Sequence, residues 1–228
     1  MAHHHHHHMS FSEWKTQPGA VFAASPVIPV IVIKELEDAL PLAEALFAGG
    51  IHVLEVTLRT PVAIKALELL INTFPDELIG AGTVITPGQF HDVVAAGARF
   101  AISPGQTREL LIAGQKSEIP LIPGVASVSE LMEGLGMGYN HFKFFPAAAA
   151  GGIPMLKAIS GVFPQVKFCP TGGINSKNYE EYLCLPNVAC VGGSWIVPEE
   201  AIKNHNWSLI TELCMAVSSQ KRELCSQN

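Results

Sequence analysis

Short apolar runs that end in glycine, proline, serine or threonine recur along the chain at intervals of 20 to 27 residues. Each run has the length and composition of a buried β-strand. The interval leaves room for one strand, one helix and two short loops. The runs share little sequence, so the repeated unit is structural. Eight strands are predicted, beginning near Val27, Ile51, Leu78, Arg99, Ile119, Asn140, Val166 and Val188.

Helical patterns fill the gaps between these runs. A threonine followed by proline supplies an N-cap and a favourable first helical residue, and a serine three residues before a glutamate forms a capping box. We therefore expect a helix between nearly every pair of strands. The start signals are Thr60-Pro61, Thr86-Pro87 and residues 127–130, and segments 38–47 and 207–217 are further helices.

Alternation of strands and helices requires parallel strands joined by crossovers, and strands as apolar as residues 27–33 are buried on both faces. Eight such units in about 200 residues favour an α/β fold of the (β/α)8 or TIM-barrel type. An open, doubly wound sheet is the alternative. Residues 1–8 are an expression tag. We expect an extra N-terminal helical segment over 9–26, closing the bottom of the barrel, and one barrel domain over 27–228.

Composition narrows the classes of function. With 48% hydrophobic and 15% charged residues, the chain can build a large core. No apolar run is long enough for a membrane helix, and no signal peptide follows Met9. The 14 lysines and arginines are scattered and the net charge is −6, unlike a nucleic-acid-binding surface. We expect a soluble, cytoplasmic protein with no membrane partner and no nucleic-acid partner.

The histidines and cysteines form no recognisable metal or redox motif. Six of the ten histidines belong to the tag, and the other four are far apart. We therefore expect no metal and no cofactor. The cysteines are odd in number and lack a C-x-x-C pair, so we interpret them as reduced thiols rather than nucleophiles. They are Cys169, Cys184, Cys190, Cys214 and Cys225.

Polar residues gather toward the end of the second predicted strand. The two-residue period of a strand places Glu55, Thr57 and Arg59 on one face. Because the opposite face carries leucine and valine, this face should point into the barrel mouth, where charges are costly unless used or paired. A structural ion pair between Glu55 and Arg59 is the alternative. His52 lies on the helix side and is interpreted as structural.

A lysine stands inside an aromatic strand. Lys143 lies in the run 141–146, between two phenylalanines. Burial of an amine favours its neutral, nucleophilic form, the condition for a Schiff base with a ketone or aldehyde. We therefore predict that Lys143 is a nucleophile. The alternative is that its stem extends between helices and carries the ammonium to water.

Glycine turns follow the last two predicted strands, at 171–174 and 192–195. In barrels these loops frequently bind phosphate, because glycine lets backbone N–H groups approach an anion and a helix N-terminus adds positive charge. The turns predict a phosphorylated substrate. Small residues at other strand ends leave room for a ligand, and Thr83 offers a hydroxyl to a carboxylate.

Seven motifs lie in order along the chain: VLEVTLRT (53–60), GAGTV (80–84), AISPG (101–105), PLIPG (120–124), FKFFPA (142–147), CPTGGI (169–174) and GGSW (192–195). Together they closely resemble the 2-keto-3-deoxy-6-phosphogluconate aldolases, also described as 2-keto-4-hydroxyglutarate aldolases. The resemblance extends from about Trp14 to the last helix. It implies a trimeric (β/α)8 barrel and a metal-independent, class I aldolase that releases pyruvate from a phosphorylated keto acid.

The resemblance also assigns roles to residues. Lys143 corresponds to the Schiff-base lysine and Glu55 to the general acid/base. Arg59 and Thr83 correspond to the residues that hold the pyruvate carboxylate. The phosphate end corresponds to Thr171, Gly172, Gly173, Gly193 and Ser194, and the pocket walls to Pro104 and Phe145.

One stretch departs from the family pattern. Many relatives carry a glutamate after FFPA, whereas this chain has alanine at 147–150. This removes a polar group near the loop on the phosphate side. Three other functions stay open: an aldolase acting on the C4 epimer 2-keto-3-deoxy-6-phosphogalactonate, a metal-dependent barrel enzyme such as an epimerase, and a non-catalytic sugar-phosphate binding barrel.

Overall fold

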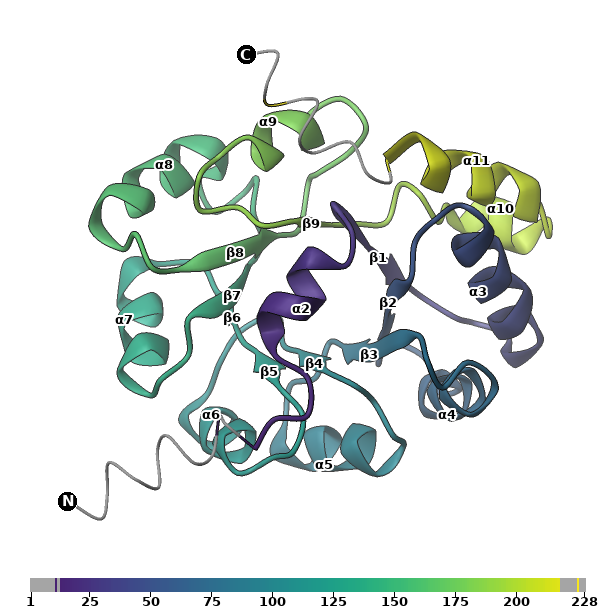
Figure 1. The fold of residues 1–228 in the computed structure, drawn as a ribbon, viewed down its shortest axis with the longest axis horizontal. Coiled ribbons are helices and arrows are strands. Elements are labelled where there is room, and N and C mark those ends of the chain that lie inside the picture. The colour runs from purple at the N-terminus through teal and green to yellow at the C-terminus, as the bar shows by residue number, and fades with distance from the viewer. Residues whose placement is uncertain (1–10, 12, 218–224, 226–228) are drawn as a thin grey trace.

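The computed structural model describes residues 11, 13–217 and 225, and in it parallel strands form a ring surrounded by helices (Figure 1). The tag at residues 1–8 lies outside the described residues. Each of the eight predicted runs contains a strand. The strands are β1 (Val27–Ile31), β2 (Val53–Thr57), β3 (Leu78–Gly82), β4 (Ala101–Ile102), β5 (Leu121–Ile122), β6 (Gly124–Val125), β7 (His141–Phe144), β8 (Lys167–Pro170) and β9 (Val191–Gly193).

The strands pair in chain order around the ring. One sheet has the order β5-β4-β3-β2-β1-β9 and the other β6-β7-β8. β5 and β6 are two halves of one strand interrupted at Pro123, which has no N–H for the ladder. Bridges at Phe168–Val188 and Thr171–Gly192 join β8 to the segment of β9. Since β9 also pairs with β1, the ring closes, and the open-sheet alternative is wrong.

Helices cover the outside of the ring in alternation with the strands, as the sequence predicts. Their apolar faces pack on the outward side chains of the strands in one continuous core. The helices are α2 (Pro18–Ala23), the 3-10 helix η1 (Leu36–Asp38), α3 (Ala39–Ala48), α4 (Ala63–Thr73), α5 (Pro87–Ala95), α6 (Arg108–Gln115), α7 (Val128–Gly136), α8 (Gly152–Val162), α9 (Tyr179–Leu183), α10 (Glu199–Lys203) and α11 (Trp207–Val217). None of these helices is long and apolar enough to cross a membrane.

Two of the three predicted helix starts are confirmed. The Thr86 side chain accepts a hydrogen bond from the Gln89 N–H at the start of α5, and Ser127 accepts one from Glu130 N–H at the start of α7. The start at Thr60-Pro61 is wrong, since α4 begins at Ala63. Thr60 instead donates its hydroxyl hydrogen bond to the Ile33 carbonyl oxygen, 2.6 Å away, which ties two strand-to-helix loops together.

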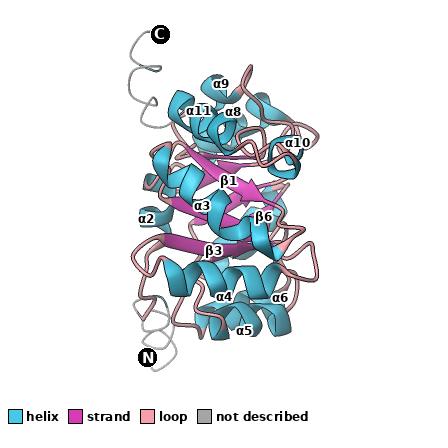
Figure 2. Cartoon of the chain, turned by 90° about the vertical axis from the view of Figure 1, so that its right-hand side faces the viewer, coloured by secondary structure: helices cyan, strands magenta, loops and turns pink. Residues whose placement is uncertain are grey.

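The helix α2 covers the end of the barrel at which the strands begin. In Figure 2 the strand arrows point away from α2. The Phe22 ring packs edge-on against His141 at the start of β7, with 5.3 Å between ring centroids. The helix predicted in 9–26 is thus present but short. Met9, Ser10 and Ser12 of this segment, and residues 218–224 and 226–228 of the predicted barrel domain, lie outside the described residues.

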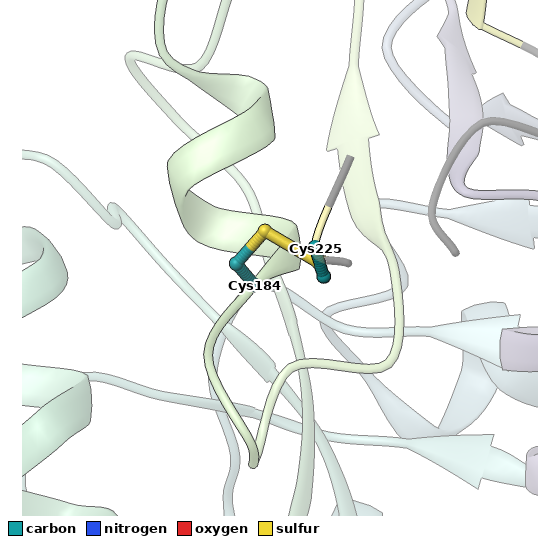
Figure 3. The surroundings of a disulfide bond; sticks show 2 residues. All are labelled: Cys184 and Cys225. Carbon is teal, nitrogen blue, oxygen red and sulfur yellow. A yellow bond between two sulfur atoms is a disulfide. The ribbon is translucent and has the colours of Figure 1, made fainter. Parts of the chain in front are cut away.

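The interpretation of all five cysteines as reduced thiols is wrong for two of them. Cys184, at the end of α9, and Cys225 form a disulfide (Figure 3). Their Cα atoms are 5.3 Å apart, which suits a disulfide. The two residues are 41 positions apart, so no short spacing in the sequence indicates the pair. Cys169, Cys190 and Cys214 are buried.

Candidate active site

A cavity of about 690 Å³ opens at the carboxyl ends of the strands. In a TIM barrel this is the end that carries catalytic residues, because the loops there connect strands to helices. The structure brings together at this cavity all the substrate-contacting residues expected from the sequence, and Glu55 lies beneath them. The expected residues on its wall are Arg59, Thr83, Pro104, Lys143, Phe145, Thr171, Gly172, Gly173, Gly193 and Ser194.

Lys143 lies at the base of the cavity on β7. Its strand neighbours in register are Gly124 on β6 and Cys169 on β8. The residue is only 6% exposed, and its Nζ lies 5.1 Å from the centroid of the Phe145 ring. A side chain that carried its ammonium between the helices to water would not line the cavity, so that alternative is wrong.

Glu55 is buried on β2 and is only 3% exposed. Its Oε2 has no hydrogen-bond partner among the described residues. Burial raises the pKa of Glu55, while the positive charge of Lys143 opposes that rise. A buried carboxyl group that is coupled to an amine and retains an unused oxygen can exchange a proton with a molecule in the cavity.

A glycine on the neighbouring strand makes room for this carboxyl group. A Cβ at Gly82 on β3 would overlap the Glu55 carboxyl group, including its Oε2. Gly82 pairs with Thr57, two residues beyond Glu55, so the glutamate side chain leans along its strand toward the cavity. The small residues that the sequence places at this strand end therefore have a specific steric function.

Arg59 and Thr83 stand on the cavity wall above Lys143 and Glu55. In the described part of the chain Arg59 is exposed and forms no ion pair with Glu55, so the structural-pair alternative is wrong. Thr83 has a left-handed backbone with φ of 55°, which a β-branched residue rarely adopts. Thr57 lines the cavity too, but donates its hydroxyl to the Ile31 carbonyl oxygen at 2.8 Å and so ties β2 to β1.

The other end of the cavity is formed by the two glycine turns. Gly172 and Gly173 have φ values of 105° and 73°, which place successive residues in left-handed conformations. A Cβ at Gly193 would overlap the Trp195 ring. Ala148 donates its N–H to the Gly172 carbonyl oxygen at 3.1 Å, so the alanine stretch does border this end of the cavity. Backbone of this kind suits an anion.

Sequence reasoning missed a charged residue at this end of the cavity, and only one of the two expected helix N-termini lies there. Glu199, the first residue of α10, lines the cavity and is the only carboxylate on its wall among the described residues. The helix after the first turn, α9, begins at Tyr179, which does not line the cavity, whereas α10 begins at Glu199 on the cavity wall. The expected helix N-terminus is therefore present after the second turn but not after the first. The only available signal was the position of Glu199 soon after the second turn.

Metal-ligating side chains are scattered in the part of the chain that the structure describes. Among the described residues, no group of three or more histidine, cysteine, aspartate or glutamate side chains could hold a metal ion. His52 lies outside the barrel, stacked on Phe47 and within 3.0 Å of a Glu77 carboxylate oxygen, in agreement with a structural role.

Comparisons with known proteins agree with this geometry. The family described as "Aldolase: KDPG and KHG aldolase" matches residues 19–213. A "2-dehydro-3-deoxy-phosphogluconate aldolase" of Pseudoalteromonas atlantica is 56% identical over 200 residues, covering 88% of this chain and 93% of the relative. The "KHG/KDPG aldolase" of Escherichia coli K12 is 52% identical, covering 88% of this chain and 94% of the relative.

A solved structure shows the same architecture. The 2-keto-3-deoxy-6-phosphogluconate aldolase of Zymomonas mobilis ZM4, crystallised with 3-phosphoglycerate, has a TM-score of 0.83 and 44% identity, covering 88% of this chain and 94% of that one. The family match over residues 19–213 includes every residue that lines the cavity. This chain therefore belongs to the KDPG and KHG aldolase family of carbon–carbon lyases.

Proposed function

We propose that this protein is a class I aldolase that cleaves 2-keto-3-deoxy-6-phosphogluconate to pyruvate and glyceraldehyde 3-phosphate. It also cleaves 2-keto-4-hydroxyglutarate to pyruvate and glyoxylate. The observation that carries the proposal is a buried lysine, Lys143, coupled to the buried carboxyl group of Glu55 at the base of a barrel-mouth cavity. Relatives named for these activities support the choice of substrates.

The lysine supplies the covalent step. The Lys143 amine attacks the C2 ketone of the substrate to give a carbinolamine, which loses water to form an iminium ion. The C4 hydroxyl then gives up its proton and the C3–C4 bond breaks. Its electron pair moves toward the iminium nitrogen, leaving an aldehyde and an enamine. Protonation of the enamine at C3, followed by addition of water to the iminium ion, releases pyruvate and restores the amine.

Glu55 carries the protons in these steps. Burial raises the pKa of its carboxyl group and so favours the protonated form, while the positive charge of Lys143 opposes that rise and favours release of the proton. These two opposing effects on the pKa suit a residue that acts as an acid in some steps and as a base in others. Arg59 and Thr83 are proposed to bind the keto-acid carboxylate, for which a guanidinium fork is well shaped.

The remaining residues of the cavity are proposed to hold the distal part of the substrate. Pro104 and Phe145 form walls on either side of the carbon chain. The phosphate lies at the two glycine turns, where backbone N–H groups approach an anion closely. The residues proposed for the phosphate are Thr171, Gly172, Gly173, Gly193 and Ser194.

The first test traps the covalent intermediate. The protein is mixed with pyruvate and sodium borohydride in the presence of EDTA and then analysed by intact and peptide mass spectrometry. We expect a stable adduct on the peptide that contains Lys143, and none with Lys143→Ala. A folded protein that gives no adduct would overturn the Schiff-base mechanism. A higher kcat/KM for the galactonate epimer would overturn the substrate assignment.

Assembly, location and domain limits complete the proposal. We propose a homotrimer, which light scattering should detect at about 73 kDa, three times the 24.4 kDa of the chain. We place the enzyme in the cytoplasm, because phosphorylated sugar acids carry charges that a bilayer excludes. Residues 27–228 are proposed to form one barrel domain preceded by the segment 9–26, and limited proteolysis should leave the barrel intact.

A further inference from the structure

Glu199 places a carboxylate beside the part of the cavity proposed for the phosphate. It lies on the same wall as Ser194 and Pro198, at the start of α10. The other charged residues on the wall, Arg59 and Lys143, serve the keto-acid end in the proposed mechanism. The phosphate end therefore carries a negative charge where a substrate brings a second one.

The charge of Glu199 is only partly neutralised. The Nζ of Lys34, just beyond β1, lies 3.6 Å from the Glu199 Oε2. The two side chains are 67% and 70% exposed, so water and ions screen the pair and it is weak. Lys34 therefore leaves the negative charge of Glu199 only partly neutralised at the edge of the cavity, where the same water reduces its effect on a bound anion to a modest one.

Glu199 also stands at the junction of two cavities. A second cavity of about 410 Å³ is adjacent, and the two share Val32, Glu199 and Ile202. Lys34 and Glu200 line only this second cavity. Glu200 is, like Glu199, an exposed carboxylate, but it does not line the substrate cavity.

These charges act differently on two substrates with the same carbon chain. A phosphate ester carries roughly −1.5 to −2 charge at pH 7, and a carboxylate beside its site repels it. The unphosphorylated sugar acid has a neutral hydroxyl group at that end. We propose that Glu199 is a specificity-determining residue that weakens the preference for phosphorylated over unphosphorylated keto acids, and that Lys34 moderates this effect by pairing with it. This inference rests on the proposed function.

The test compares kcat/KM for 2-keto-3-deoxy-6-phosphogluconate and for 2-keto-3-deoxygluconate. In Glu199→Gln the ratio of the two should rise about three- to tenfold, through a lower KM for the phosphorylated substrate. Glu200→Gln is the matched control and should leave the ratio within about twofold of the wild type. The difference between Glu199→Gln and wild type should shrink in about 1 M salt, where charges are screened within a few ångströms.

A double-mutant comparison isolates the part played by Lys34. Lys34→Met should lower the ratio in the wild-type background and have no effect in the Glu199→Gln background, because Lys34 acts through Glu199. An effect that persists there would overturn the role assigned to Lys34. An unchanged ratio in Glu199→Gln, or an equal rise with both substrates, would overturn the role of Glu199. Failure of the proposed function is distinct, since the wild type would then turn over neither substrate and give no pyruvate adduct.

Discussion

The two ends of the barrel are built from the same strands but satisfy their polar groups in opposite ways. At the closed end, beneath α2, the Trp14 Nε1 donates to the Gly114 carbonyl oxygen at 2.9 Å, and the Tyr139 hydroxyl donates to the Leu111 carbonyl oxygen at 2.6 Å. At the open end, the Glu55 Oε2 is buried without a hydrogen-bond partner among the described residues. The positive charge of Lys143 opposes the rise that burial causes in the pKa of Glu55.

This difference separates stability from chemistry along the barrel axis. Polar groups that are fully paired hold the closed end together, whereas buried polar groups left available to a substrate lower stability where they stand. The strained backbone of Thr83 lies at the same open end. Substitutions at the open end should therefore remove activity without unfolding the protein. Substitutions at the closed end should lower stability without removing activity.

The largest effect is expected at Lys143. Lys143→Ala should lose essentially all turnover, because no other amine lines the cavity in the described part of the chain. The protein should still fold, since removing a buried amine also removes its desolvation cost. Steady-state turnover and circular dichroism check both parts. Activity within about tenfold of the wild type would contradict the role of this lysine.

Glu55→Gln should slow turnover by about 10²- to 10⁴-fold, because the amide keeps the shape of the side chain but cannot transfer the proton. The rate of the full reaction is the measurement. Lys143 and the cavity are unaltered in this variant, so pyruvate should still bind. If the rate were unchanged, Glu55 would be a structural residue only.

The same substitution should change how stability depends on pH. Burial raises the pKa of Glu55 above its ordinary value of 4.5, so the folded protein holds this proton more tightly than the unfolded chain. The stabilising contribution is full below the unfolded pKa and is lost as pH rises through the folded pKa. Thermal unfolding at pH 4 and at pH 8 should show Glu55→Gln gaining on the wild type at the higher pH. A constant difference between the two proteins would contradict the pKa shift.

A substitution at the closed end should lower stability and leave kcat unchanged. Phe22 on α2 is 2% exposed and packs against His141. Phe22→Ala should lower the free energy of unfolding by about 3–5 kcal/mol, the usual cost of deleting a buried aromatic ring. Chemical denaturation measures this loss. The kcat of the folded fraction should stay at the wild-type value, and a matching fall in kcat would show that the two ends are coupled.

Most of the fold could be predicted from the sequence because its signals are local and repeated. Apolar strand runs, N-caps such as Ser127 and glycine turns recur around the ring, so an error at one unit does not change the architecture. The error at Thr60 shows the limit. Its hydroxyl is used by a loop carbonyl of the preceding unit, Ile33, a contact that no local pattern reveals.

The site was predictable where a residue conflicted with its surroundings. A lysine among phenylalanines and a glutamate in an apolar strand are costly in place, and that cost marked Lys143 and Glu55. Glu199 lies in an ordinary polar helix start, and its position soon after the second glycine turn is the only signal that the sequence offers. The Cys184–Cys225 disulfide depends on the folded path of the chain between the two residues, which spacing alone does not give.

The smallest effects should come from Gly80 and Gly82 on β3. Because these glycines are two residues apart, they test the difference between the closed and the open end of the barrel at close range. A Cβ at Gly80 would overlap the Phe100 ring, whereas a Cβ at Gly82 would overlap the Glu55 carboxyl group. Gly80→Ala should therefore lower the free energy of unfolding by about 1–3 kcal/mol through overpacking, with kcat retained. Gly82→Ala should displace the Glu55 carboxyl group. Its main effect should be a lower kcat rather than a lower free energy of unfolding. Equal losses of kcat in the two variants would mean that the position of Glu55 does not depend on Gly82. In that case residues at the position of Gly82 would belong to the stabilising part of the barrel, and the catalytic part would begin closer to the mouth.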